Sequence, residues 1–67
     1  MVVDDPGEAA RLARAGCDVV VVVPEGERAP VVDGPGRVAF FVGRPADPAD
    51  RAAADAMDAE LFGASQA

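Results

Sequence analysis

The most regular apolar pattern in the chain is a run of five valines, residues 19–23, between Asp18 and Pro24. Valine is restricted at χ1 and packs well on a pleated surface, so a short uniform run of this kind favours a strand over a helix. Successive strand side chains point to opposite faces, and both faces of this strand are apolar. The pattern therefore predicts a central strand of a parallel sheet, covered on both sides.

Two further apolar runs predict the neighbours of this strand. Residues 37–42, Arg-Val-Ala-Phe-Phe-Val, also lack alternation, so we expect a second strand covered on both faces. Residues 1–3, Met-Val-Val, are compatible with a short first strand.

Two helices are predicted by a repeated start signal. Asp5-Pro6 and Asp47-Pro48 each place an N-cap acid before a proline in the first helical position. The first helix should run over residues 6–15 and stop at Gly16, because glycine is common in the position that follows the last residue of a helix. Helical periodicity places Ala9, Leu12 and Ala13 on its docking face.

The second helix should reach about Phe62 and end at Gly63. Its expected docking face consists of the following apolar side chains: Ala49, Ala53, Ala56, Met57 and Leu61.

These elements define an α/β protein of β-α-β-(loop)-β-α order, with a mainly parallel three-stranded sheet and two helices. Residues 24–36 are rich in proline and glycine and are expected to be a loop. Within it, Val31-Val32 is compatible with either a fourth short strand or plain loop. Residues 1–63 are expected to form one small domain and residues 64–67 a frayed tail.

Composition excludes several classes of function. The 67 residues carry 12 acidic and 6 basic side chains, a formal net charge of −6, and the six arginines are scattered, so nucleic-acid binding is disfavoured. No apolar run approaches the roughly 20 residues that span a bilayer, and the first residues lack the order of a signal peptide. The expected location is the cytoplasm, with no membrane partner.

The reactive side chains are few. One cysteine and no histidine exclude an internal disulfide and a cysteine-rich metal site and disfavour a zinc site, and no cofactor is expected. Cys17 is expected to be a small buried apolar residue. Ser65, the single hydroxyl residue, has no histidine to act as its base. No catalytic residue is identified, and a non-enzymatic role is favoured.

One ligand site is nevertheless conceivable, because the carboxyl ends of parallel strands share one edge of a sheet. That edge should carry the candidate ligand-binding residues Asp4, Asp5, Arg44 and Asp47, with Glu25 nearby. Carboxylates there could bind Mg²⁺ and Arg44 could face a phosphate. The alternative is that Asp5 and Asp47 are helix caps and the others solvated loop charges.

Two resemblances bear on this site. Val2-Val3-Asp4-Asp5-Pro6, followed by residues 15–20, resembles the opening of response-regulator receiver domains, which implies an acidic pair that helps to bind Mg²⁺. Residues 12–20 resemble the passage from helix to second strand in Rossmann-like domains. The chain is too short for five βα units and its first helix is brief, so we transfer no function from either family.

The two apolar strands raise a problem of burial. The two helices carry few large apolar side chains, whereas burying a side chain such as valine is worth on the order of 1.5 to 3 kcal/mol. Additional cover could come from a second copy of the chain, which we favour, from an unidentified protein, or from further sequence. The alternative is a compact monomer, because alanine-rich helices can pack tightly. The first hypothesis is a non-catalytic interaction or regulatory module that self-associates or binds a protein. The alternatives are a minimal Rossmann-like or receiver-like ligand-binding or Mg²⁺-binding domain, and a remnant of a larger α/β enzyme.

Overall fold

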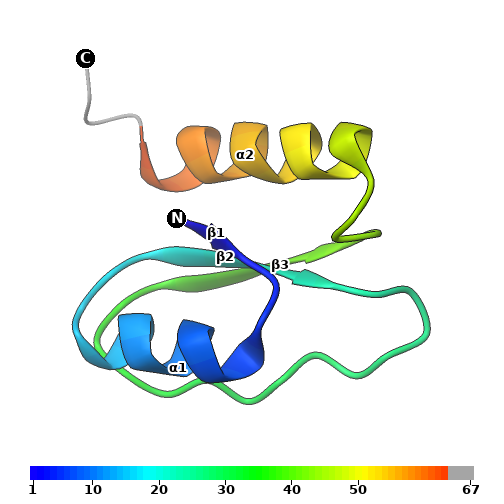
Figure 1. Ribbon diagram of the computed structural model, residues 1–67. Helices are drawn as coiled ribbons and strands as arrows, with labels where there is room; N and C mark the ends of the chain where they lie inside the picture. Colours follow the sequence, from blue (N-terminus) through cyan, green and yellow to red (C-terminus); the bar gives the residue numbers. More distant parts are fainter. Residues whose placement is uncertain (64–67) are drawn as a thin grey trace.

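The predicted α/β architecture is confirmed by a computed structural model, which describes residues 1–63 (Figure 1). The expected tail, residues 64–67, lies outside the described residues. Three strands and two helices follow one another as β1 (Val2–Val3), α1 (Pro6–Arg14), β2 (Val19–Val23), β3 (Val38–Val42) and α2 (Pro48–Phe62).

The strands form one parallel sheet in the order β1-β2-β3. Val20 of β2 lies opposite Val2 on one side and Ala39 on the other. Because β2 has a strand on each edge and a layer on each face, its five valines are at most 5% exposed. The prediction that this run is the interior strand is confirmed.

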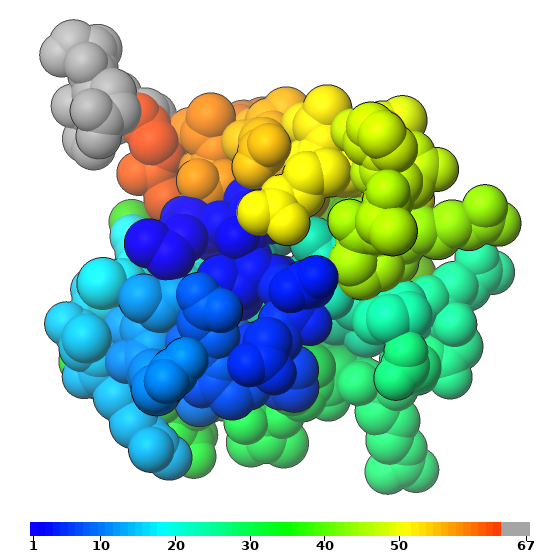
Figure 2. All heavy atoms as spheres, in the orientation of Figure 1, coloured from blue at the N-terminus to red at the C-terminus, as the bar shows by residue number. Residues whose placement is uncertain are grey.

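The two faces of the sheet have different covers. Helix α1 lies on one face and α2 on the other, and both pack mainly against β1 and β2 (Figure 1). Side chains fill the space between the layers, as the sphere representation in Figure 2 shows. Ala9 packs on the α1 face with the odd-numbered valines of β2, whereas Ala54 packs on the α2 face with Val20 and Val22.

The connection from β2 to β3 is a loop that crosses the α1 face. Val32 of this loop packs in the same apolar cluster as α1, and Val31-Val32 forms no strand. The Gly36 amide donates a hydrogen bond to the Ala13 carbonyl (3.0 Å). Glycine is required at position 36, because a Cβ there would lie 2.0 Å from the Cys17 carbonyl oxygen.

Both helix starts follow the predicted capping chemistry. The Asp5 carboxylate accepts hydrogen bonds from the amides of Gly7 (3.4 Å) and Glu8 (3.3 Å). The Asp47 carboxylate accepts one from the amide of Ala49 (2.8 Å). Helix α1 ends at Arg14, one residue before the expected position, and its cap residue Ala15 is followed by Gly16. The φ of 87° at Gly16 is easily adopted only by glycine.

Helix α2 docks through a different face from the one expected. Ala54 is its buried residue, and Met57 and Phe62 are partly buried. Of the five predicted contacts only Met57 packs on the core, whereas Ala49, Ala53, Ala56 and Leu61 are exposed. Two acidic residues can lie beside the docked face because each carboxylate accepts a hydrogen bond there. Asp50 accepts from the Arg44 amide (2.8 Å) and Asp58 pairs with the Met1 ammonium group (2.6 Å).

Cys17 is exposed, so the prediction that it is a buried apolar residue is wrong. It occupies the turn between α1 and β2, where its amide donates to the Leu12 carbonyl (2.9 Å) and its side chain faces solvent. Among residues 1–63, no helix is both long and apolar enough to cross a bilayer.

Candidate functional site

The outer edge of β3 presents backbone groups that no strand pairs within residues 1–63. The Val19 amide donates to the Arg37 carbonyl (2.9 Å), and the Gly43 amide donates to the Val23 carbonyl (3.0 Å). These two bonds direct the amides and carbonyls of odd-numbered β3 residues toward β2. The N–H and C=O groups of Val38, Phe40 and Val42 therefore point away from β2, where the described sheet has no further strand.

The side chains of these three residues share the α1 face of the sheet. Val38, Phe40 and Val42 lie opposite Val19, Val21 and Val23, all on the α1 side. Only Val38 packs against the α1-side cluster, while Phe40 and Val42 remain 40% and 65% exposed. We call Val38, Phe40 and Val42, with their outward backbone groups, the β3 margin.

The β3 margin corrects one expectation. The absence of alternation in residues 37–42 predicted cover on both faces, and this is wrong for the α1 face. On the α2 face Ala39 and Phe41 do pack, against the buried cluster that also holds Ala54 of α2. On the α1 face the cover is a loop whose one packed apolar side chain is Val32, and this leaves Phe40 and Val42 partly open to solvent.

The amino ends of β2 and β3 are joined by a charge pair. The Asp18 carboxylate accepts bonds from the Arg37 guanidinium (2.7 Å) and from the Arg37 amide (2.9 Å). These hydrogen bonds lower the pKa of Asp18 below its ordinary value of 3.8, and the same contact raises the pKa of Arg37. The guanidinium also lies 5.0 Å from the centroid of the Phe62 ring, which ties α2 to this end of the sheet.

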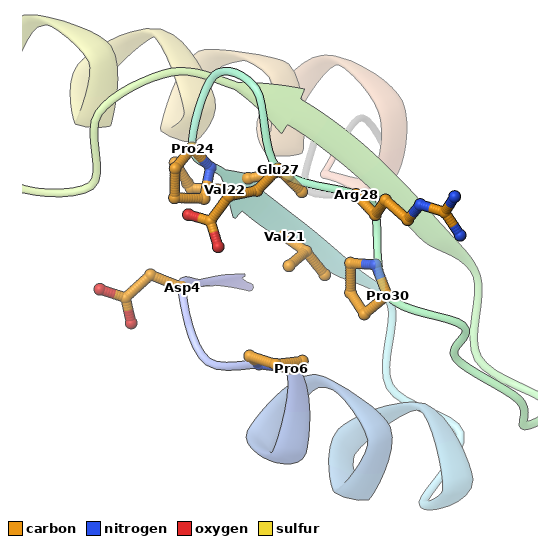
Figure 3. A pocket seen from close by; sticks show the side chains of 9 residues that line it. Asp4, Pro6, Val21, Val22, Pro24, Glu27, Arg28 and Pro30 are labelled. Atoms are coloured by element: carbon orange, nitrogen blue, oxygen red, sulfur yellow. The ribbon is translucent and has the colours of Figure 1, made fainter.

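A shallow cavity of about 240 Å³ lies at the opposite end of the sheet, on the α1 face (Figure 3). Its walls are mainly valine and proline side chains, among them Val21 and Pro30. Asp4, Glu27 and Arg28 also line it, but the Asp4 carboxylate points outward and the Arg28 guanidinium extends away from the cavity in Figure 3. The Glu27 carboxylate is directed toward Asp4 (Figure 3), so the cavity combines valine and proline walls with acidic side chains.

The four candidate ligand-binding residues lie at the expected end of the sheet without forming one group. Asp4 lines the cavity, whereas Asp5 caps α1 on one face and Asp47 caps α2 on the other. Arg44 is exposed after β3, and its amide is bonded to Asp50. The sheet thus separates the two caps, and both keep their carboxylates on helix amides. Within residues 1–63, no three carboxylate or cysteine side chains are grouped as metal ligands would be.

Sequence reasoning did not identify the exposure of Phe40 and Val42. A usable signal was present: residues 24–36 hold proline and glycine in place of a helix, so nothing with a broad apolar face precedes β3. A strand preceded by such a loop lacks the crossover helix that normally covers a parallel strand.

Comparison of the chain with protein-family models, with curated proteins and with solved structures finds no match.

Proposed function

We propose that this chain is a non-catalytic protein-interaction module that binds an extended segment of a protein along the β3 margin. The observation that supports this most directly is a five-residue edge strand that combines outward backbone groups with the partly exposed side chains Phe40 and Val42. Addition of a strand to an open sheet edge is an established mode of peptide recognition, in which main-chain hydrogen bonds supply affinity and side chains supply selectivity.

The margin also lacks the features that usually protect an edge. Natural edge strands are commonly blunted by charges, prolines or bulges. Val38–Val42 contains none of these residues, and its pairing with β2 runs without interruption from Val38 to Val42. The flanking Arg37 and Arg44 lie outside the strand.

The second candidate function, ligand binding at the carboxyl edge, has weaker support. Of its four residues, only Asp4 lines the cavity, and the Asp5 and Asp47 carboxylates already accept amide hydrogen bonds. The two acids that line the cavity, Asp4 and Glu27, disfavour a phosphate there. A cytoplasmic location stays a prediction from the sequence.

The proposal is tested by titrating ¹⁵N-labelled protein with a peptide of residues 37–44, used as a model strand. We expect the largest amide shifts at Val38, Phe40 and Val42, because their N–H groups face the added strand. A peptide in which every second residue is N-methylated, so that it cannot pair, is the control. Absence of shifts in the β3 margin at millimolar peptide would contradict the proposal.

A further inference from the structure

The strand that best fits the β3 margin is the margin of a second copy of this chain. We infer that two copies associate through β3 as an antiparallel pair centred on Phe40, which joins two three-stranded sheets into one. This inference rests on the proposed function and names its partner.

The pattern of outward groups is self-complementary. In an antiparallel pair, two directly opposed residues exchange both of their N–H···O bonds when their backbone groups point toward each other. With Phe40 opposite Phe40 of the second copy, Val38 lies opposite Val42 and Val42 opposite Val38. All three pairs then join residues whose N–H and C=O already point outward, so every free group of the margin finds a partner.

The same register brings the exposed side chains together. Val38, Phe40 and Val42 all lie on the α1 face, and a two-fold axis perpendicular to the sheet keeps that face common to both copies. The two Phe40 rings become cross-strand neighbours, flanked by Val38–Val42 pairs. Aromatic and β-branched pairs of this kind are favourable across antiparallel strands.

The distribution of charge favours the β3 margin over the rest of the surface as the interface between two copies. Each chain carries a net charge of −6, so most surfaces of two copies repel one another. The segment from Arg37 to Arg44 contains no acidic residue. Arg37 is held by Asp18. Arg44 follows the carboxyl end of β3, which the antiparallel pairing places beside the amino end of the second copy's β3 and the loop that contains Asp33.

A contact of one strand on each side is smaller than the roughly 1,200 to 2,000 Å² of stable protein interfaces. The association should therefore be weak and reversible, with a Kd on the order of 100 μM.

Cysteine cross-linking tests the register. In a Cys17→Ser background, which removes the exposed native thiol, Phe40→Cys places two thiols opposite each other with Cα atoms about 5.5 Å apart, within disulfide range. Val42→Cys is the matched control. Position 42 is more exposed than position 40, yet its two copies would be about 13 Å apart along the strands. We expect diamide to cross-link Phe40→Cys at least ten times faster than Val42→Cys; equal rates, or a faster Val42→Cys, would overturn the register.

Proline scanning tests the association without removing Phe40. Val42→Pro deletes one outward N–H and no bond to β2, so edge geometry tolerates it in the monomer. Sedimentation of the wild-type chain should show dimer at millimolar concentration, retained by Val42→Ala and lost in Val42→Pro at unchanged circular dichroism. A wild-type chain that stays monomeric at millimolar concentration would overturn the inference. If that monomer still binds the peptide of residues 37–44, the proposed function stands and only the choice of partner fails.

Discussion

Strands β2 and β3 are equal in length and both are entirely apolar, yet their environments differ sharply. The valines of β2 are at most 5% exposed, whereas Val42 of β3 is 65% exposed and Phe40 is 40% exposed. The difference comes from position: β2 has a strand on each side and a helix on each face, while β3 has one neighbouring strand and a loop on its α1 face. An apolar strand is thus a core element in one place and a binding surface in another.

The two edges of the sheet differ in the same way. The β1 edge is two residues long, and the Arg51 guanidinium donates to its Val2 carbonyl (3.2 Å). The β3 edge is five residues long, and its outward groups have no such partner among the described residues. An added strand therefore finds a longer and less obstructed template at β3.

The largest difference in stability between β2 and β3 is expected when an acidic residue is placed in each strand in turn. Val21→Asp should unfold the chain, because burying an isolated carboxylate costs several kcal/mol, and the total stability of a chain this long is only roughly 3 to 10 kcal/mol. Val42→Asp should leave a folded monomer, since its side chain reaches solvent. Far-UV circular dichroism distinguishes the two, and a folded Val21→Asp variant would contradict the assignment of β2 to the interior.

Truncation to alanine sharpens the same comparison. Val21→Ala should lower the free energy of unfolding by about 2 kcal/mol, from lost burial and a residual cavity. Val42→Ala, at a position 65% exposed, should change it by less than about 0.5 kcal/mol. Urea unfolding, at protein concentrations too low for the chains to associate, measures both changes in the free energy of unfolding. Equal losses at the two positions would show that β3 is as well covered as β2.

The Asp18–Arg37 pair predicts a smaller, pH-dependent effect at the amino ends of β2 and β3. Because folding lowers the pKa of Asp18, the pair contributes stability above the ordinary value of 3.8 and loses it as the pH falls through the lower, folded pKa. The pair is partly exposed, so the contribution is small. In Asp18→Asn the free energy of unfolding should fall less steeply with decreasing pH in this acidic range than in wild type, and Asp33→Asn is the control. The same pH dependence in Asp18→Asn and in wild type would contradict a contribution from this pair.

The elements that sequence predicted best are those in which one strong local signal acts alone. The five valines predicted a strand that is buried on both faces, and the structure confirms it. Asp5-Pro6 and Asp47-Pro48 each predicted a helix start that the structure also confirms. The docking face of α2 was missed because its many alanines give every side some apolar character. Two acids beside the docked face, Asp50 and Asp58, are bonded to the Arg44 amide and the Met1 ammonium group, which lie elsewhere in the sequence.

The candidate site was harder to predict than the fold. Sequence order placed Asp4, Asp5, Arg44 and Asp47 at one end of the sheet, but it did not reveal that the sheet lies between the two capped helices. The exposure of Phe40 and Val42 depends on which face the loop crosses and how much of β3 it covers. The pattern of residues within a segment does not directly indicate how a distant loop packs on it.

The most direct test of the interaction surface is amide hydrogen exchange of β3 at two protein concentrations, about 20 μM and about 2 mM, on either side of the expected Kd. The account predicts that the amides of Val38, Phe40 and Val42 exchange more slowly at the higher concentration. The amides of Ala39 and Phe41, already directed toward β2, should exchange at unchanged rates. Exchange at Val38, Phe40 and Val42 that is independent of concentration would contradict self-association through this edge.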